Sequence, residues 1–246
     1  MQWRDEAIVL GGRKFGEGGL VLDVLTAGHG RRSGLVYGGA SRKRRAQFEP
    51  GNSVSLAWSA RLEDQLGRFD TAELTSARAA ALYDAPEGLS AVQTITAVLR
   101  DALSDGDRAG SSVYHASLLL LDSLSYPTLW PALYVRWELG LLSELGFGLD
   151  FSACAVSGAN DGLTHVSPRT GRAVRGSDVP DYAERLLKLP GFLLDSSHGV
   201  PPDDLAAGFR LTGHFLRYRL YEATGRQMPT TRDQMLARLK RTGAIV

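Results

Sequence analysis

Residues 38–50 read Gly-Gly-Ala-Ser-Arg-Lys-Arg-Arg-Ala-Gln-Phe-Glu-Pro and place four consecutive cations at positions 42–45. Glycines precede the cations and a proline follows them, which is typical of a connection between regular elements. On both sides apolar and polar residues alternate, most clearly at 53–59, where Val54, Leu56 and Trp58 are separated by small residues. The pattern predicts a basic, flexible loop between two half-buried strands.

The first 75 residues carry five short segments with the pattern of strands, at 7–10, 20–26, 31–38, 53–59 and 66–74. Glycines mark the bends, and Gly11-Gly12 is expected to end the first segment. Five short strands in so small a space predict a closed barrel, and the OB-fold is the five-stranded form. An SH3-like barrel is the alternative, because a strand count does not fix topology.

The pattern changes to helical periodicity near Asp84, which with Glu87 gives a helix-start signal. Helices are expected at 84–103, 111–125, 128–145, 181–189 and 203–224, with a last one from Thr230. Residues 148–180, rich in Gly, Ser and Asp, are expected to be irregular. The fold class is therefore α+β: an OB-fold domain at 1–78 and an all-helical domain at 79–246, with an irregular insert at about 148–180.

Composition sets limits on the class of protein. The 246 residues are 43% hydrophobic and 22% charged, with a net charge of +1, so binding to nucleic acid requires a local basic patch. Residues 11–50 supply one, with eight Lys/Arg against three Asp/Glu. The single cysteine, Cys154, excludes an intrachain disulfide and fits a reducing compartment. No secretory signal is visible and the longest leucine run, 118–121, is too short for a membrane, so we expect a cytoplasmic protein.

Three basic clusters are expected to meet on the barrel. One lies in the link after the first strand, one opens the third strand, and one is the quoted stretch. Turns of a small barrel bring such clusters together, and basic barrel surfaces with exposed rings bind single strands. The candidate DNA contacts are Arg13, Lys14, Arg31, Arg32, Arg42, Lys43, Arg44 and Arg45, with Phe15, Tyr37 and Phe48 as nearby rings. The alternative is a solvated loop on a barrel that serves as a protein-binding adaptor.

Catalytic patterns are weak. The five histidines show no metal-ligand spacing, and no GxSxG, HExxH or phosphate-loop motif occurs. Cys154 with His165 as its base is the one nucleophilic pair considered, and a lone loop cysteine without a signature is more often structural. The sequence therefore favours a binding protein over an enzyme such as a cysteine-dependent hydrolase.

Two blocks of sequence resemble the bacterial RecO family of recombination mediators. The first runs from Glu6–Leu10 through Tyr37–Ala40 to Gln47–Pro50, and the second from Arg136–Leu139 through Leu145–Asp150 to Cys154. The resemblance implies an OB-fold with a helical C-terminal domain and no catalytic residues. It also implies annealing of complementary strands and loading of recombinase onto single-stranded DNA coated by SSB. The implied partners are single- and double-stranded DNA, RecR and the acidic C-terminal tail of SSB, in a cytoplasmic, nucleoid-associated setting.

The chain departs from the family at a metal site. Many members carry a four-cysteine zinc site in the segment after the third helix, whereas here only Cys154 remains. Ser157 occupies the partner position, and the second pair falls near Arg175 and Asp178. Since a structural zinc normally takes four N or S ligands, we expect no zinc and no other cofactor. The segment is then expected to be stabilised by packing of Phe151, Val156, Val166 and Val174.

The resemblance also suggests a peptide site. Arg136 corresponds to the arginine of an Arg-aromatic-Glu-Leu motif of the family, and Leu133, Trp137 and Leu141 lie around it in the sequence. An apolar slot with an arginine at its mouth suits a peptide that ends in hydrophobic residues and a free carboxylate. The alternative is that Arg136 pairs with Glu138 or another carboxylate and is structural, although residues two apart point to different sides of a helix.

Overall fold

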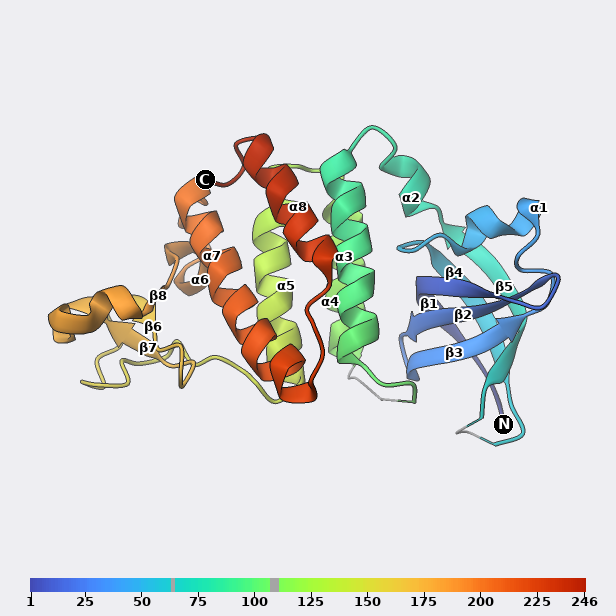
Figure 1. Cartoon of the computed structure of the whole chain (residues 1–246), viewed down its shortest axis with the longest axis horizontal. Helices are drawn as coiled ribbons and strands as arrows, with labels where there is room; N and C mark the ends of the chain where they lie inside the picture. The colour runs from blue at the N-terminus through green and yellow to red at the C-terminus, as the bar shows by residue number, and fades with distance from the viewer. Residues whose placement is uncertain (63–64, 107–110) are drawn as a thin grey trace. The chain divides into compact units, whose positions relative to one another are not determined.

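The computed structural model describes residues 1–62, 65–106 and 111–246. It divides into two compact units, Met1–Pro127 with Pro229–Met235, and Thr128–Met228 with Leu236–Val246. In these described ranges, no helix has the length and apolar character needed to cross a bilayer. The first unit contains a β-barrel (Figure 1).

The barrel consists of β1 (Gln2–Phe15), β2 (Gly19–Thr26), β3 (Gly30–Val36), β4 (Ser53–Ser59) and β5 (Gly67–Ser76). The strands close in the order β1-β2-β3-β5-β4. Every neighbouring pair is antiparallel except β3 and β5, which meet in parallel through Gly34↔Gly67 and Leu35↔Arg68. This five-stranded closed barrel confirms the predicted OB-fold and not the SH3-like alternative.

Glycines allow the β3–β5 seam to close over the core. A Cβ on Gly67 would lie 2.2 Å from the indole of Trp58, and one on Gly34 would lie 2.7 Å from the ring of Phe69. Both rings are buried in the barrel. Aliphatic side chains fill the rest of this core, namely Val9, Leu20, Leu22, Val24, Val36, Val54 and Leu56. The seam therefore depends on two positions that carry no side chain.

β1 does not end at Gly11-Gly12 as expected. A bulge between Val9 and Gly11 shifts the register, after which the strand pairs with β2 as far as Phe15↔Gly19. A Cβ on Gly11 would lie 2.8 Å from the guanidinium of Arg100, so the glycine makes room for this side chain. Arg13 and Lys14 consequently lie on a strand and not in a link.

The basic stretch is helical and not a flexible loop. Residues Arg42–Arg45 form α1 and Ala46–Phe48 form the short helix η1. Phe48 is 5% exposed, and Asn52 Nδ2 donates to the Ala46 carbonyl at 3.1 Å. The buried ring and this hydrogen bond fix the end of the stretch, a tertiary effect that local composition does not reveal.

Helices α2 (Arg78–Ala81), α3 (Pro86–Ala102) and α4 (Ser111–Ser123) belong to the same unit as the barrel. Arg31 Nη1 donates to the carbonyls of Arg100 and Leu103 at 2.9 and 2.6 Å, which satisfies acceptors at the end of α3. Arg78 Nε meets Asp122 Oδ1 of α4 at 2.6 Å. These contacts connect segments of the compact unit that runs from Met1 to Pro127.

The second unit contains α5 (Trp130–Glu144), α6 (Gly191–Leu194), α7 (Pro202–Phe215), a π-helical turn η4 (Leu216–Tyr221), η5 (Glu222–Thr224) and the end of α8 (Thr230–Arg241). α5 packs on α7, and Thr212 of α7 donates to the buried carboxylate of Glu138 on α5.

The segment expected to be irregular contains a small sheet. Strands β6 (Leu163–Val166), β7 (Ala173–Arg175) and β8 (Leu187–Lys188) pair in the order β7-β6-β8. The prediction of a helix at 181–189 was also wrong. Two 3-10 turns, η2 (Gly176–Asp178) and η3 (Pro180–Arg185), precede β8 there. Strands of two to four residues are too short to show a periodic pattern.

Candidate nucleic-acid interface on the barrel

The ends of β1 and β3 expose two aromatic rings. Phe15 pairs with Gly19, and Tyr37 follows Val36, the partner of Leu20, so the two rings lie on either side of Gly19. Phe15 is 52% exposed and Tyr37 69%. The side chains of Arg13 and Lys14, on the same end of β1, are also exposed. Exposed rings beside cations are the arrangement on which single-stranded nucleic acid stacks.

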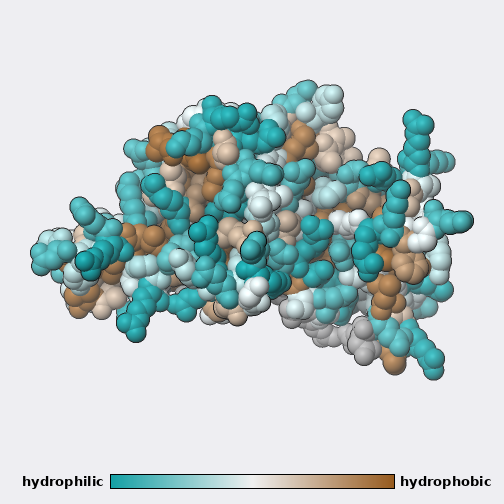
Figure 2. Space-filling model, viewed as in Figure 1, coloured by the Kyte–Doolittle hydropathy of each residue, from teal (hydrophilic) through white to brown (hydrophobic). Residues whose placement is uncertain are grey.

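α1 lies next to this end of the barrel. Ala40 N donates to the Gly18 carbonyl at 3.3 Å, which joins the turn before α1 to the β1–β2 turn. On α1 the side chains of Arg42, Lys43 and Arg45 are exposed, and no hydrogen bond or ion pair joins them to any described residue. Figure 2 shows hydrophilic side chains projecting from the surface over α1, at the right edge of the view. These three cations are available to a polyanion.

Arg44 has a different role from its neighbours. Its guanidinium donates to the carbonyl of Tyr37 at 3.0 Å and to that of Ala72 at 3.4 Å, and it lies 5.4 Å from the centre of the Phe48 ring. Arg44 therefore attaches α1 to the barrel. Phe48 is core and is not a stacking ring.

Arg31 and Arg32 do not join the exposed cluster. Arg31 is occupied by the carbonyls at the end of α3 and lies 3.7 Å from Asp23. Arg32 is only 4% exposed. Of the eight cations proposed from the sequence, the structure exposes and leaves available Arg13, Lys14, Arg42, Lys43 and Arg45.

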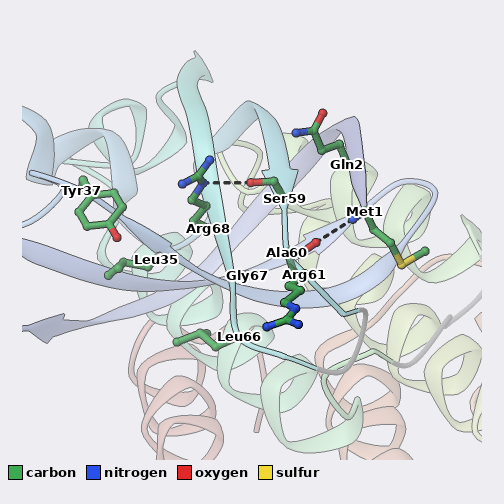
Figure 3. A pocket seen from close by; sticks show the side chains of 10 residues that line it. All are labelled: Met1, Gln2, Leu35, Tyr37, Ser59, Ala60, Arg61, Leu66, Gly67 and Arg68. Atoms are coloured by element: carbon green, nitrogen blue, oxygen red, sulfur yellow. Dashed lines mark hydrogen bonds between the residues drawn. The ribbon is translucent and has the colours of Figure 1, made fainter.

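A groove of about 650 Å³ extends this surface across the β3–β5 seam (Figure 3). Its lining includes Leu35 and Tyr37 at the end of β3, Arg68 from β5, and Arg61 and Leu66 from the connection before β5. Arg68 Nε is oriented by Ser59 Oγ at 3.1 Å and by Asp70 Oδ1 at 2.7 Å. The sequence reasoning missed these two arginines. The available signal was their place in the sequence, with Arg61 just after the expected strand 53–59 and Arg68 near the start of the expected strand 66–74.

The second unit places together the four positions at which the family resemblance located a zinc site. Ser157 Oγ donates to Asp178 Oδ2 at 2.5 Å, the Cys154 thiol contacts the same oxygen at 3.4 Å, and Arg175 N donates to Cys154 Sγ at 3.3 Å. The hydrogen bond from Ser157 holds the pKa of Asp178 below its usual value. Among the described residues, no three His, Cys, Asp or Glu side chains form a group that would hold a metal. The hydrogen bonds among Cys154, Ser157, Arg175 and Asp178 connect these four positions.

Packing supports the same segment in part. Val166 and Val174 are buried as expected, whereas Val156 is 59% exposed and Phe151 only half-buried. The nucleophilic pair considered from the sequence does not form. His165 bonds to Thr164 Oγ1 at 2.9 Å, and burial lowers its pKa. The partners of the Cys154 thiol are Asp178 and Arg175 instead.

The four residues of the expected peptide slot separate into two groups. Trp137 and Leu141 are buried core residues, 4% and 2% exposed. Arg136 is on the exposed side of α5, where its guanidinium donates to the backbone carbonyl of Phe192 and lies 5.9 Å from the centre of the Phe192 ring. Leu133 is half-buried. Arg136 makes no ion pair with Glu138 or any other described carboxylate. Its charge thus has no acidic partner in the described part of the chain.

The fold and the site together define a class, that of OB-barrel proteins with a basic, ring-bearing surface and an appended helical unit. The family model for the N-terminal part of recombination protein O matches residues 1–78, and the model for its C-terminal part matches residues 84–227. The chain is 62% identical to a DNA repair protein RecO of Hyphomonas neptunium, over 97% of this chain and 98% of that protein. It is 45% identical to one of Paracoccus denitrificans, over 97% and 96%. The chain belongs to the RecO family of DNA repair proteins.

Proposed function

We propose that the protein is a DNA-binding recombination mediator that works by binding and not by chemistry. The observation that carries the proposal is the barrel surface on which five available cations accompany two exposed rings and a groove. Its ligands are single- and double-stranded DNA. Its action is to anneal complementary strands and to help load recombinase onto DNA coated by SSB, in the cytoplasm at the nucleoid.

Charge neutralisation explains why such a surface favours annealing. Two strands repel each other through their phosphates, and contacts to phosphate lower this repulsion without selecting a sequence. Tyr37 and Phe15 offer ring faces to bases, and stacking of this kind is tolerant of base identity. A strand bound in this way keeps its base edges free to pair.

RecR and the acidic tail of SSB are the proposed protein partners. The family membership supports both, and Arg136 supports the second. Its guanidinium is at the surface of α5 and has no carboxylate partner among the described residues, and Leu133 offers apolar surface one turn earlier. A terminal carboxylate next to a hydrophobic side chain fits these two groups.

A salt series tests the barrel site. The variant R42Q/K43Q/R45Q removes three available cations and leaves the anchor Arg44 in place. Each phosphate contact to a single strand contributes about 0.7 to the slope of log affinity on log salt, so the slope is expected to fall by about 2. The control, R238Q/K240Q/R241Q, removes equal charge from α8.

The expected result is a flatter slope and slower annealing in the α1 variant alone. Equal slopes in the parent and the α1 variant, with the fold intact by circular dichroism, contradict a DNA site at α1. They favour the second candidate, a barrel that binds protein and whose cations are solvated surface. Equal losses in the α1 variant and the control indicate a response to net charge only.

A further inference from the structure

A second basic groove lies wholly within the second unit. It has a volume of about 540 Å³ and is formed by the β6–β7 turn, which contributes Pro168 and Arg169, and by α7 with the π-helical turn that follows it. These helical segments contribute His214, Tyr218 and Arg219. None of the lining residues in the described chain is acidic. None of these lining residues belongs to the barrel.

Two rings form one wall of the groove. Tyr218 is 50% exposed, and its ring centre lies 4.6 Å from that of His214. His214 Nε2 is 3.1 Å from the Pro168 carbonyl, which can only accept, so this nitrogen donates and fixes the ring. Tyr218 thus has a supported ring that remains open to solvent on half its surface.

Two arginines flank these rings. Arg219 Nη2 donates to the Arg169 carbonyl at 2.7 Å, which orients its guanidinium and leaves its other N–H groups available. The side chain of Arg169 is exposed and bonds to no described residue, and the same holds for Arg217, which precedes Tyr218. The π-helical turn presents residues 217–219 to solvent in succession, and such turns are frequent at functional sites.

We propose that this groove is a second binding site for single-stranded nucleic acid, with a base stacked on Tyr218 and phosphates at Arg169 and Arg219. A planar ring beside guanidinium groups matches the two chemical parts of a nucleotide. An acidic peptide with hydrophobic residues fits less well, because Pro168 is the sole aliphatic residue in the described lining. A second strand site on the same chain gives an annealing protein a place for the complementary strand.

The test is the stoichiometry of binding of an oligothymidylate of about 8 nucleotides to the full chain at low salt, since one OB-fold covers about 4–16 nucleotides. Two equivalents are expected for the parent. The variant R169Q/R219Q should bind one, and Y218A should weaken that one equivalent by at least about fivefold. The matched control Y182A/R185Q, which removes an exposed tyrosine and an exposed arginine from η3, should still bind two.

A photo-crosslink locates the second equivalent directly. Irradiation of an oligonucleotide carrying 5-iododeoxyuridine should label a peptide that contains Tyr218, and the label should be absent from R169Q/R219Q. Failure of the proposed barrel site gives a different result from failure of the groove site. In that case R42Q/K43Q/R45Q binds as much oligothymidylate as the parent, while the groove variant R169Q/R219Q still binds one equivalent less. Two equivalents in every groove variant, with no label on Tyr218, overturn the inference. Loss of an acidic peptide without loss of oligonucleotide also overturns it.

Discussion

Replacing Gly67 by alanine tests the closure of the barrel. The added Cβ would lie 2.2 Å from Cε2 and Nε1 of Trp58 and 2.5 Å from Cζ2. Carbon atoms in contact are normally about 3.5–4.0 Å apart, so the indole must move by more than 1 Å. Trp58 is 2% exposed, and its Nε1 donates to the Ser33 carbonyl at 3.3 Å, so the ring has little room to move.

Two costs add in the G67A variant. Overpacking of a filled core costs about 1–3 kcal/mol, and loss of the Trp58 hydrogen bond costs about 1 kcal/mol. The free energy of unfolding of the barrel is therefore expected to fall by roughly 2–4 kcal/mol. Because Gly67 lines the groove of Figure 3, affinity for single-stranded DNA should fall as well.

Denaturant unfolding measures the change in the free energy of unfolding of G67A. Amide exchange followed by mass spectrometry locates the destabilised strands, and faster exchange is expected in β3 and β5. G140A is the control, because nothing lies within 4 Å of a Cβ at this position of α5, and alanine favours a helix by up to about 1 kcal/mol. W58F should recover part of the loss in the double variant, since it removes one ring of the indole. An unfolding free energy of G67A equal to that of the parent would refute the steric argument.

Three further outcomes are expected. The pKa of Asp178 is lower in the folded protein than its ordinary value of 3.8, so its contribution to stability is present above that pH and is lost as the pH falls through the folded-state pKa. Asp178→Asn should therefore remove part of the fall in stability at low pH. Measuring the unfolding of parent and variant as a function of pH checks this. Elemental analysis of protein purified without a metal-affinity tag should find no stoichiometric zinc, and about one zinc per chain contradicts the reasoning from Cys154. Arg136→Ala should lose an SSB tail peptide and keep naked single-stranded DNA, and retention of both places the tail elsewhere.

The sequence predicted the barrel because its signals are local. The alternation at Val54, Leu56 and Trp58 and the glycines at bends follow from the period of a strand, and both survive in the structure. The prediction that the first strand ends at Gly11-Gly12 was wrong, because a long-range effect overrides the local pattern. Gly11-Gly12 has the local pattern of a stop, but pairing with β2 carries the strand through a bulge, which is a long-range effect.

The DNA site on the barrel was predicted only in part, because its cations are visible locally but their partners are set by long-range contacts. Runs of cations identify where charge lies in the chain, but they do not tell which guanidinium is available. Arg31 bonds to a carbonyl 69 residues away along the chain, and Arg44 bonds to carbonyls 7 and 28 residues away, so the run of cations alone does not separate them from Arg42 or Arg45. The groove over the seam was missed because Arg61, Arg68 and Tyr37 line a common groove only after β3 and β5 pair.

The first unit is built from two separate stretches of chain, Met1–Pro127 and Pro229–Met235, and this affects its folding during synthesis. Thr94 Oγ1 of α3 donates to the Thr231 carbonyl at 3.0 Å, in the segment Pro229–Met235 that completes this unit. The ribosome makes that segment about a hundred residues after Pro127, a delay of roughly 5–20 seconds at common elongation rates. Until then Thr94 lacks this contact with Thr231, so the first unit is completed only after residues 229–235 have been made.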